Sequence, residues 1–288
     1  MSAPFVELDW LQARLREPNL RVVDARSTPH GAPGVVAQSG AERYAAGHIP
    51  GAIHLDYADD LADPATPYAA RVAPPERFAT VLGAHGIGDG ALIVAYDDGD
   101  VPYAARMVWM LRYYGHDQAY ILAGGLGAWA AAGLAQSVEP ARFAPSTFTT
   151  RVHPHERASR DEVLAAALGG SQAQVLDVQR DGTYALRDRA IAGAARLSAN
   201  LLLEDARGGR LAPRERIAEL ARAQGLDPAK RTIVYCGSGV AAAGAAFALR
   251  DAGFDDVAVY DGSWMEWSHD GLPTTAKGSP SEGPRAQT

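Results

Sequence analysis

The side chain best suited to covalent chemistry is Cys236, the only cysteine in the 288 residues of the chain. It follows an apolar run, TIVY at 232–235, and precedes a glycine-rich segment, GSGVAA at 237–242. This pattern predicts a strand that ends in a tight turn and continues into a helix beginning near Val240. The free amides and the positive dipole end of such a helix would face the sulfur and favour its thiolate form. The spacing therefore indicates a nucleophilic cysteine.

The residues that follow the cysteine are predicted to form a cradle of backbone amides. Glycines in this segment let the backbone curl tightly and approach a ligand. A lone cysteine is more often a buried structural residue, but a core cysteine needs no glycine turn where a strand becomes a helix. We therefore expect an anion to bind at the amides of Gly237, Ser238, Gly239, Val240 and Ala241.

A curled loop around a cysteine also occurs in other classes of enzyme, but the catalytic residues that accompany the cysteine in those enzymes are absent from this sequence. Cysteine phosphatases place an arginine six residues after the cysteine, where it binds the phosphate oxygens. That position is Ala242, Ala243 follows it, and the loop has neither arginine nor lysine. A cysteine protease or acyltransferase would need a base and an oxyanion site beside the thiol, and the sequence has no signature of either.

The chemistry that remains is sulfur transfer. The thiolate of Cys236 would take a sulfur atom from a small-molecule donor, hold it as a persulfide stabilised by the amides, and pass it to a second nucleophile. This chemistry requires no metal and no organic cofactor. Because no second cysteine can resolve the persulfide, we expect an external acceptor, such as cyanide, a small thiol or a reduced thioredoxin-like protein.

The elements that position the cysteine belong to a sequence that repeats itself. Three segments of the first half recur in the second half in the same order. They are RVVDAR at 21–26 and AQVLDVQR at 173–180, the segments 92–116 and 232–254, and ILAGGLGAWAAAGL at 121–134 and VYDGSWMEWSHDGL at 259–272. In each half, short apolar runs alternate with helical patterns, which is typical of parallel strands joined by crossover helices.

The predicted fold class is therefore α/β, with two tandem domains, each a parallel sheet flanked by helices. We place the first domain at 1–138 and the second, which carries the cysteine, at 157–276. The segment 139–156 is polar and contains several prolines, so it is predicted to be a linker. The tail 277–288 is rich in glycine, serine and proline and is predicted to be disordered.

Composition and charge exclude several classes of partner. The formal net charge of −7 and the pI near 5.6 provide no basic field for nucleic acid. The N-terminus has no signal-peptide pattern, and the longest apolar stretch, around 239–249, is too short to span a bilayer. We expect a soluble cytoplasmic protein that binds neither nucleic acid nor membrane, and the single cysteine fits a reducing compartment.

Five further motifs, in a characteristic order, carry a resemblance to a known family. They are ERYAAGHIPGAIHLD at 42–56, LADPATPY at 61–68, GHDQAYILAGGLGAW at 115–129, CGSGVAA at 236–242 and YDGSWMEW at 260–267. With these motifs the sequence resembles the two-domain rhodanese family of thiosulfate and 3-mercaptopyruvate sulfurtransferases, over nearly its whole length. The resemblance implies tandem rhodanese domains with the active cysteine in the second. The first domain has Asp97 or Asp98 where the cysteine would be, and is expected to be catalytically silent.

The resemblance also suggests a proton relay. The CGSG loop is similar to the mercaptopyruvate type, in which the serine belongs to a relay with a histidine of the first domain, whereas thiosulfate enzymes usually carry basic residues after the cysteine. Ser238 and His48 match these relay positions. Glu42 is the nearest candidate for the acidic member. From the residues alone, His48 is instead interpreted as a histidine that caps the GHIPGA turn.

Arginines are the expected ligands of a substrate carboxylate. Arg106 matches a first-domain arginine of the family, which makes it a carboxylate clamp; the alternative is a surface helix residue in an ion pair. The resemblance further implies two clamp arginines in the second domain, but the segment that carries them is shortened. Only 16 positions separate Asp177 from Gly193, against 27 in the corresponding part of the first half.

The sequence TYALRDRAIAGA at 183–194 stands in place of the missing segment, and its only cations, Arg187 and Arg189, either replace the missing arginines or are merely solvated. The preferred donor is thus open between thiosulfate and 3-mercaptopyruvate. The function predicted is a sulfurtransferase that works through a Cys236 persulfide. The alternatives are a persulfide carrier fed by a protein desulfurase and a non-catalytic rhodanese-like binding protein.

Overall fold

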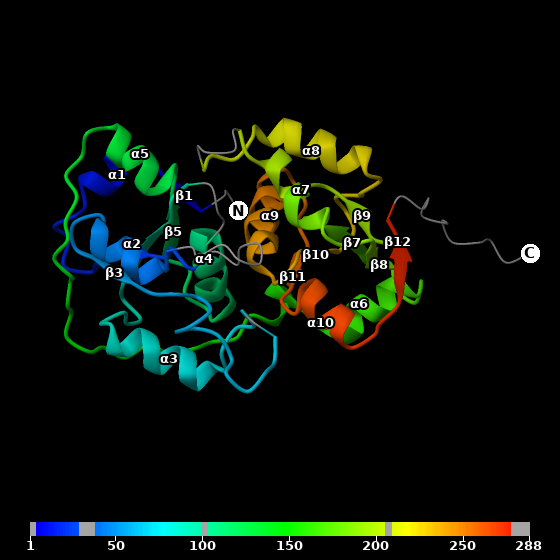
Figure 1. Cartoon of the computed structure of the whole chain (residues 1–288), viewed down its shortest axis with the longest axis horizontal. Helices are drawn as coiled ribbons and strands as arrows, with labels where there is room; N and C mark the ends of the chain where they lie inside the picture. The colour runs from blue at the N-terminus through cyan, green and yellow to red at the C-terminus, as the bar shows by residue number, and fades with distance from the viewer. Residues whose placement is uncertain (1–3, 29–37, 69, 100–102, 205–208, 278–288) are drawn as a thin grey trace, which may run out of the picture. The chain divides into compact units, whose positions relative to one another are not determined.

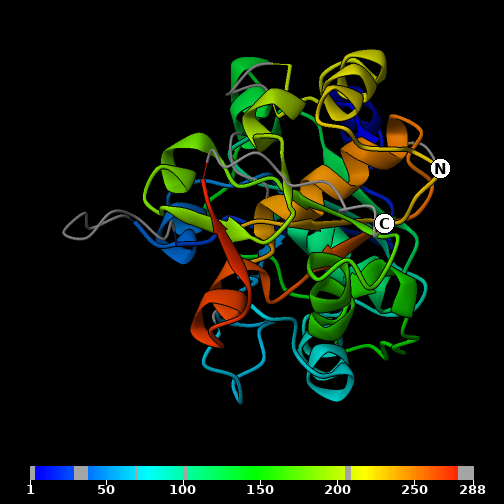
Figure 2. The same cartoon turned by 90° about the vertical axis from the view of Figure 1, so that its right-hand side faces the viewer.

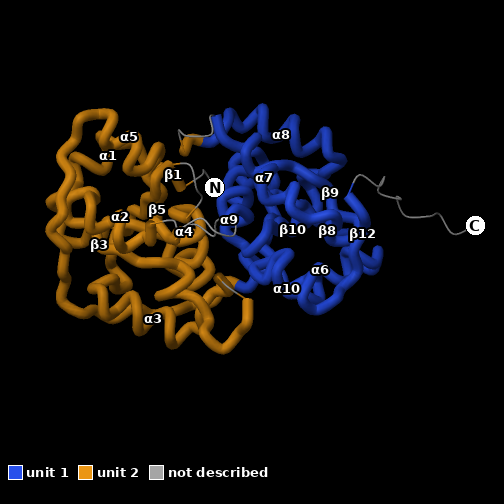
Figure 3. Tube along the Cα trace, in the orientation of Figure 1, with its two compact units in different colours: residues 1–3, 154–204, 211–288 blue, residues 4–153, 205–210 orange. Residues whose placement is uncertain are grey.

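The computed structural model describes residues 4–28, 38–68, 70–99, 103–204 and 209–277, and it divides into two compact units (Figures 1 and 3). The N-terminal unit comprises the described residues of 4–153 together with Gly209 and Arg210. The C-terminal unit comprises 154–204 and 211–277. Each unit contains a parallel sheet with helices packed on it, so the predicted α/β class with two tandem domains is confirmed.

The N-terminal unit is built on a five-stranded sheet in the order β1-β5-β4-β2-β3, and every pair of neighbours is parallel. Its strands are β1 (Phe5–Val6), β2 (Leu20–Asp24), β3 (Ala52–His54), β4 (Leu92–Tyr96) and β5 (Ala119–Leu122). Its helices are α1 (Leu8–Gln12), α2 (Gly40–Ala46), α3 (Pro75–Ala84), α4 (Tyr103–Tyr113) and α5 (Gly125–Ala131). Helices cover both faces, which is why the central strands read as continuous apolar runs.

The C-terminal unit repeats this strand order as β6-β11-β10-β7-β9. Its parallel strands are β6 (Arg157–Ala158), β7 (Gln174–Asp177), β9 (Ala195–Arg196), β10 (Thr232–Tyr235) and β11 (Val257–Tyr260). Its helices are α6 (Arg160–Ala167), α7 (Asp181–Tyr184), α8 (Arg214–Ala223), α9 (Val240–Asp251) and α10 (Ser263–His269), with 3-10 turns η1 (Pro154–Glu156) and η2 (Ala199–Leu202). Helices α8 and α9 lie side by side (Figure 1). A separate antiparallel pair joins β8 (Arg189–Ile191) to β12 (Thr274–Ala276), the red strand at the front of Figure 2.

The repeat extends to the hydrogen bonds of the core. Trp129 and Trp267 are buried at corresponding positions of α5 and α10. The Trp129 indole donates to the carbonyl of Ala135 at 2.8 Å, and the Trp267 indole donates to the carbonyl of Pro273 at 2.9 Å. In both units the tryptophan therefore ties the end of the helix to the chain that follows.

The segment expected to be a linker, 139–156, packs in large part along the N-terminal unit. The amide of Ser146 donates to the carbonyl of Gly83 at 2.9 Å, and the amide of Arg151 donates to the carbonyl of Tyr114 at 2.9 Å. Phe148 is buried in this unit. The division between the two units consequently falls at 153/154. Of the tail predicted at 277–288, only Lys277 lies among the described residues, and it is bonded to Tyr184.

Candidate active site

Cys236 lies at the carboxyl end of β10, between the ends of β7 and β11. After β7 the chain continues to β9, toward one end of the strand order, but after β10 it continues to β11, toward the other end. This reversal marks the switch point where ligands bind in open α/β sheets. The cysteine is only 3% exposed. The topology therefore places the predicted nucleophile at the edge of the sheet where a site is expected.

The turn after β11 is hydrogen-bonded to the cysteine loop, which we define as residues 236–242. The amide of Cys236 donates to the hydroxyl of Ser263 at 3.2 Å. The amide of Trp264 donates to the carbonyl of Cys236, and the amide of Met265 to that of Gly237, both at 3.0 Å. Ser263 is fully buried and has a φ of 52°, a left-handed conformation that is uncommon for a residue with a side chain. Such strain is typical of functional turns.

The amides of the cysteine loop are free of acceptors in the described part of the chain, as the predicted cradle requires. Gly239 has a φ of 81° and is the N-cap of α9, so a residue with a side chain would be strained there. Among the described residues, none accepts a hydrogen bond from the amides of Gly237 to Ala242. These amides include those of Val240 and Ala241 in the first turn of α9. The cradle is open to an anion, and the binding role of these residues stays a prediction.

Ser238 lies within the cysteine loop and is partly exposed. Its hydroxyl contacts no polar group in the described part of the chain. It is therefore available to a ligand held beside Cys236.

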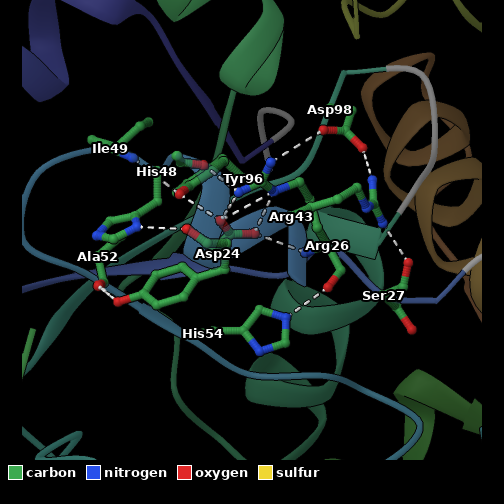
Figure 4. Close-up of polar contacts among 12 residues, drawn as sticks. Asp24, Arg26, Ser27, Arg43, His48, Ile49, Ala52, His54, Tyr96 and Asp98 are labelled. Atoms are coloured by element: carbon green, nitrogen blue, oxygen red, sulfur yellow. Dashed lines mark hydrogen bonds and ion pairs between the residues drawn. The ribbon is translucent and has the colours of Figure 1, made fainter. Parts of the chain in front are cut away.

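His48, its predicted relay partner, lies in the N-terminal unit and is fully buried (Figure 4). Its Nδ1 lies 2.8 Å from the carbonyl of Tyr44, and its Nε2 lies 3.0 Å from the carbonyl of Glu139. The ring also stacks on that of Tyr44, with centroids 3.9 Å apart. Both ring nitrogens face backbone carbonyls, which favours the alternative interpretation of a histidine that closes the turn after α2. Glu42 also has a structural role, because it forms a capping box with Ser39 at the start of α2.

Arg106 is fully buried in α4 of the N-terminal unit, so the alternative of a surface helix residue is wrong. Its Nη2 donates to the carbonyl of Ala70 at 2.5 Å, and its guanidinium carbon lies 4.6 Å from the ring centroid of Trp109. These contacts fix the side chain within its own unit. The carboxylate clamp stays a prediction.

The two arginines of the shortened segment have different environments. Arg187 is almost buried, pairs with the carboxylate of Asp177, and lies with its guanidinium carbon 4.4 Å from the ring centroid of Trp264. Its Nε and Nη1 have no hydrogen-bond partner among the described residues. Arg189 is exposed and bonds to Thr274, which links β8 to β12. Of these two arginines, only Arg187 approaches the cysteine loop, because it stacks on Trp264.

The N-terminal unit shows which residue corresponds to the cysteine. The hydroxyl of Tyr96 accepts the amide of Ile49 at 3.2 Å, just as that of Tyr235 accepts the amide of Ile191 at 3.1 Å. Burial and a neighbouring aspartate raise the pKa of each tyrosine well above its ordinary value. Because the tyrosines correspond, Asp97 occupies the place of the cysteine.

Two residues that the sequence analysis did not single out lie beside the cysteine loop. One is Ser263, which occupies the place of Gly125 in the repeat. The other is Gln179, whose Nε2 lies 3.5 Å from the position that a Cβ of Gly237 would take. Comparing VLDVQR with RVVDAR could have identified Gln179, because it replaces Arg26. Among the described residues, no group of three or more histidine, cysteine, aspartate or glutamate side chains is placed to hold a metal ion.

Comparison with known proteins defines the class. The sequence pattern of the rhodanese-like domain matches residues 7–132 and again 160–270. The chain belongs to the rhodanese family. No helix in the described residues combines the length and the apolar character that crossing a membrane requires.

The relatives within this family are sulfurtransferases. The chain is 30% identical over 272 residues to the 3-mercaptopyruvate sulfurtransferase of Escherichia coli, with 91% of this chain and 94% of that protein covered. It is 31% identical over 287 residues to the thiosulfate sulfurtransferase of Bos taurus, with 94% and 93% covered. The crystal structure of SseA, a 3-mercaptopyruvate sulfotransferase from Escherichia coli, superposes with a TM-score of 0.82 at 29% identity and covers 91% of this chain and 99% of its own. Like these relatives, the protein is a sulfurtransferase.

Proposed function

We propose that this sulfurtransferase moves a sulfane sulfur from thiosulfate or 3-mercaptopyruvate, through a persulfide on Cys236, to an external thiophile. The observation that carries the proposal is the set of amides from Gly237 to Ala242, which follow the end of β10 and have no acceptor among the described residues. An outer persulfide sulfur is an anion at neutral pH and is suited to such a cradle. The two donors are those in the names of the relatives.

The first half-reaction loads the cysteine. The thiolate of Cys236 attacks the outer sulfur of thiosulfate, the S–S bond breaks, and sulfite leaves with the electron pair. With 3-mercaptopyruvate the C–S bond breaks instead, and pyruvate leaves as its enolate and takes up a proton. Ser238 is the loop hydroxyl available to deliver that proton. Arg187 is the cation best placed to attract the donor, since Arg189 is committed to the β8–β12 pair.

The second half-reaction empties the cysteine. A thiolate or cyanide attacks the outer sulfur, the persulfide S–S bond breaks, and Cys236 leaves as the thiolate with the electron pair. The acceptor becomes a persulfide or thiocyanate. Atoms and electrons balance over the cycle, so no separate oxidant or reductant is consumed.

The proposal is tested by product formation. Purified protein is supplied with cyanide and either donor, and thiocyanate is measured over time, with Cys236→Ser as the control. We expect thiocyanate with at least one donor and none above background from the variant. Turnover by Cys236→Ser would contradict the persulfide. Failure of the native protein with both donors would instead favour a carrier that receives sulfur from a protein desulfurase.

A further inference from the structure

The two units place different side chains at one equivalent position beside the site. Asp24 ends β2 and Asp177 ends β7. Each carboxylate accepts the amide two residues further on, from Arg26 at 3.1 Å and from Gln179 at 3.0 Å. The backbone therefore turns in the same way in both units. Arg26 and Gln179 leave it at the same point, the carboxyl end of the strand next to β4 or β10.

In the N-terminal unit most of the hydrogen-bonding capacity of the side chain at this position is used (Figure 4). Nη2 of Arg26 donates to Asp24 Oδ2 at 2.6 Å and to the carbonyl of Gly47 at 2.7 Å. Its Nη1 lies 3.7 Å from Asp98. Arg26 thus neutralises the buried aspartate, and it has little capacity left for a ligand.

In the C-terminal unit, an arginine from another segment neutralises the buried aspartate. Asp177 is 1% exposed and pairs with Arg187, which comes from the chain just before β8. Position 179 therefore needs no charge, and the Nε2 of Gln179 lies 3.5 Å from the position that a Cβ of Gly237 would take. The Oε1 of Gln179 is buried, and no described residue donates a hydrogen bond to it.

A buried carbonyl oxygen without a donor is unfavourable unless a ligand supplies one. Sulfur donors differ in this capacity. Thiosulfate is a dianion that has no hydrogen to donate at neutral pH. 3-Mercaptopyruvate has a single carboxylate, a thiol hydrogen, and an enol product with an O–H group. A neutral carboxamide suits the second kind of donor, whereas a free guanidinium would suit the first.

We propose that Gln179 is a specificity-determining residue of the sulfur-transfer site, and that its carboxamide selects a singly charged thiol-bearing 2-oxo acid over the thiosulfate dianion. The inference rests on the proposed function, since it concerns donor choice in the Cys236 reaction. The juxtaposition that carries it is the pairing of Asp177 with Arg187, which frees Gln179 to face Gly237. Gln179 acts by positioning the donor and takes no part in bond breaking.

Two variants test this inference through the ratio of kcat/KM for the two donors. Gln179→Met keeps the length of the side chain and removes its hydrogen-bonding atoms. We expect it to lower kcat/KM about tenfold for 3-mercaptopyruvate and less than about twofold for thiosulfate. Gln179→Arg installs the residue of the N-terminal unit, and we expect it to shift the ratio about tenfold toward thiosulfate.

The matched control is Gln172→Met, an exposed glutamine just before β7 at the opposite edge of the same sheet, which should leave the ratio unchanged. Equal losses with both donors would show a merely structural residue and overturn the inference. An unchanged ratio in both variants would also overturn it. If the native protein accepts neither donor, the proposed function itself fails, so the two failures are distinguishable. Should Gln179→Met fold poorly by circular dichroism, the Gln179→Arg ratio decides.

Discussion

The two units present the same loop in two states, one filled and one open. In the N-terminal unit, Asp97 Oδ1 accepts the amide of Gly99 at 2.7 Å, and its Oδ2 accepts the amide of Ala104, in the first turn of α4, at 3.0 Å. In the C-terminal unit, Cys236 leaves the corresponding amides without an acceptor among the described residues. The side chain at this one position therefore decides whether the loop amides have an acceptor within the described part of the chain.

The turn beneath each loop differs in the same sense. Gly125 and Ser263 occupy the same place in the repeat and have φ values of 54° and 52°. A Cβ at Gly125 would lie 2.3 Å from the carbonyl oxygen of Asp97, so only glycine fits there. At Ser263 the loop stands clear, and the hydroxyl receives the amide of Cys236. The open loop has thus gained a support that the filled loop has no room for.

The largest effect is expected when the open loop is converted into the filled one. Cys236→Asp removes the nucleophile and places a carboxylate among the free amides. Activity should fall by at least about 10³-fold, and the variant should be about 1 kcal/mol more stable than Cys236→Ser, because the carboxylate caps the helix. Thiocyanate assays and chemical denaturation measure the two effects. A variant less stable than Cys236→Ser would contradict the comparison between the loops.

The next effect concerns the buried ion pair that exists in a different form in each unit. Arg187→Ala leaves Asp177 as an unpaired buried charge, which should cost about 3 kcal/mol of unfolding free energy. It also removes the cation stacked on Trp264, so activity should fall as well. Urea denaturation measures the loss, with Arg187→Lys as a control that keeps the charge. A change within error of zero would show that the pair with Asp177 contributes nothing.

A smaller effect is expected from removing the support of the open loop. Ser263→Gly installs the residue of the N-terminal unit, which relieves the left-handed backbone but loses the hydrogen bond from Cys236. We expect stability to stay the same or rise slightly, while kcat/KM falls about tenfold. Steady-state kinetics and thermal denaturation on one preparation separate the two. If activity and stability fall together, the serine supports the whole turn and not the cysteine in particular.

The smallest effect on activity is expected at His48. The environment of this ring indicates a structural histidine, so His48→Gln should leave kcat within about twofold and lower the unfolding free energy by about 1–3 kcal/mol. If the pH profile of kcat loses one limb in the variant, the result would support a role for His48 in a proton relay. Such a loss is the result that a structural role cannot produce.

Much of this architecture could be predicted from the sequence because the signals are local. The apolar runs that end at Asp24 and Asp177 gave the strands, and the type and spacing of Cys236 and its glycines indicated the loop. The packing of Ser146 on Gly83 could not be foreseen, because its hydrogen bond joins backbone atoms far apart in the chain and leaves no trace in residue types.

The rest of the site depends on partners that residue types do not identify. Nothing in the spacing indicates that Arg187 pairs with Asp177, since the path of a shortened crossover is set by packing. That path in turn determines what Gln179 faces. At His48 the motif and the structure indicate different roles, because a match to a motif carries no information about the burial of the ring.

The most direct test of the central claim is the mass of the intact protein after incubation with each donor in the absence of an acceptor. An open cradle at Cys236 predicts a gain of one sulfur atom, reversed by dithiothreitol and absent from Cys236→Asp and Cys236→Ser. No gain in the native protein with either donor would contradict the claim that this loop carries sulfur taken from a small molecule.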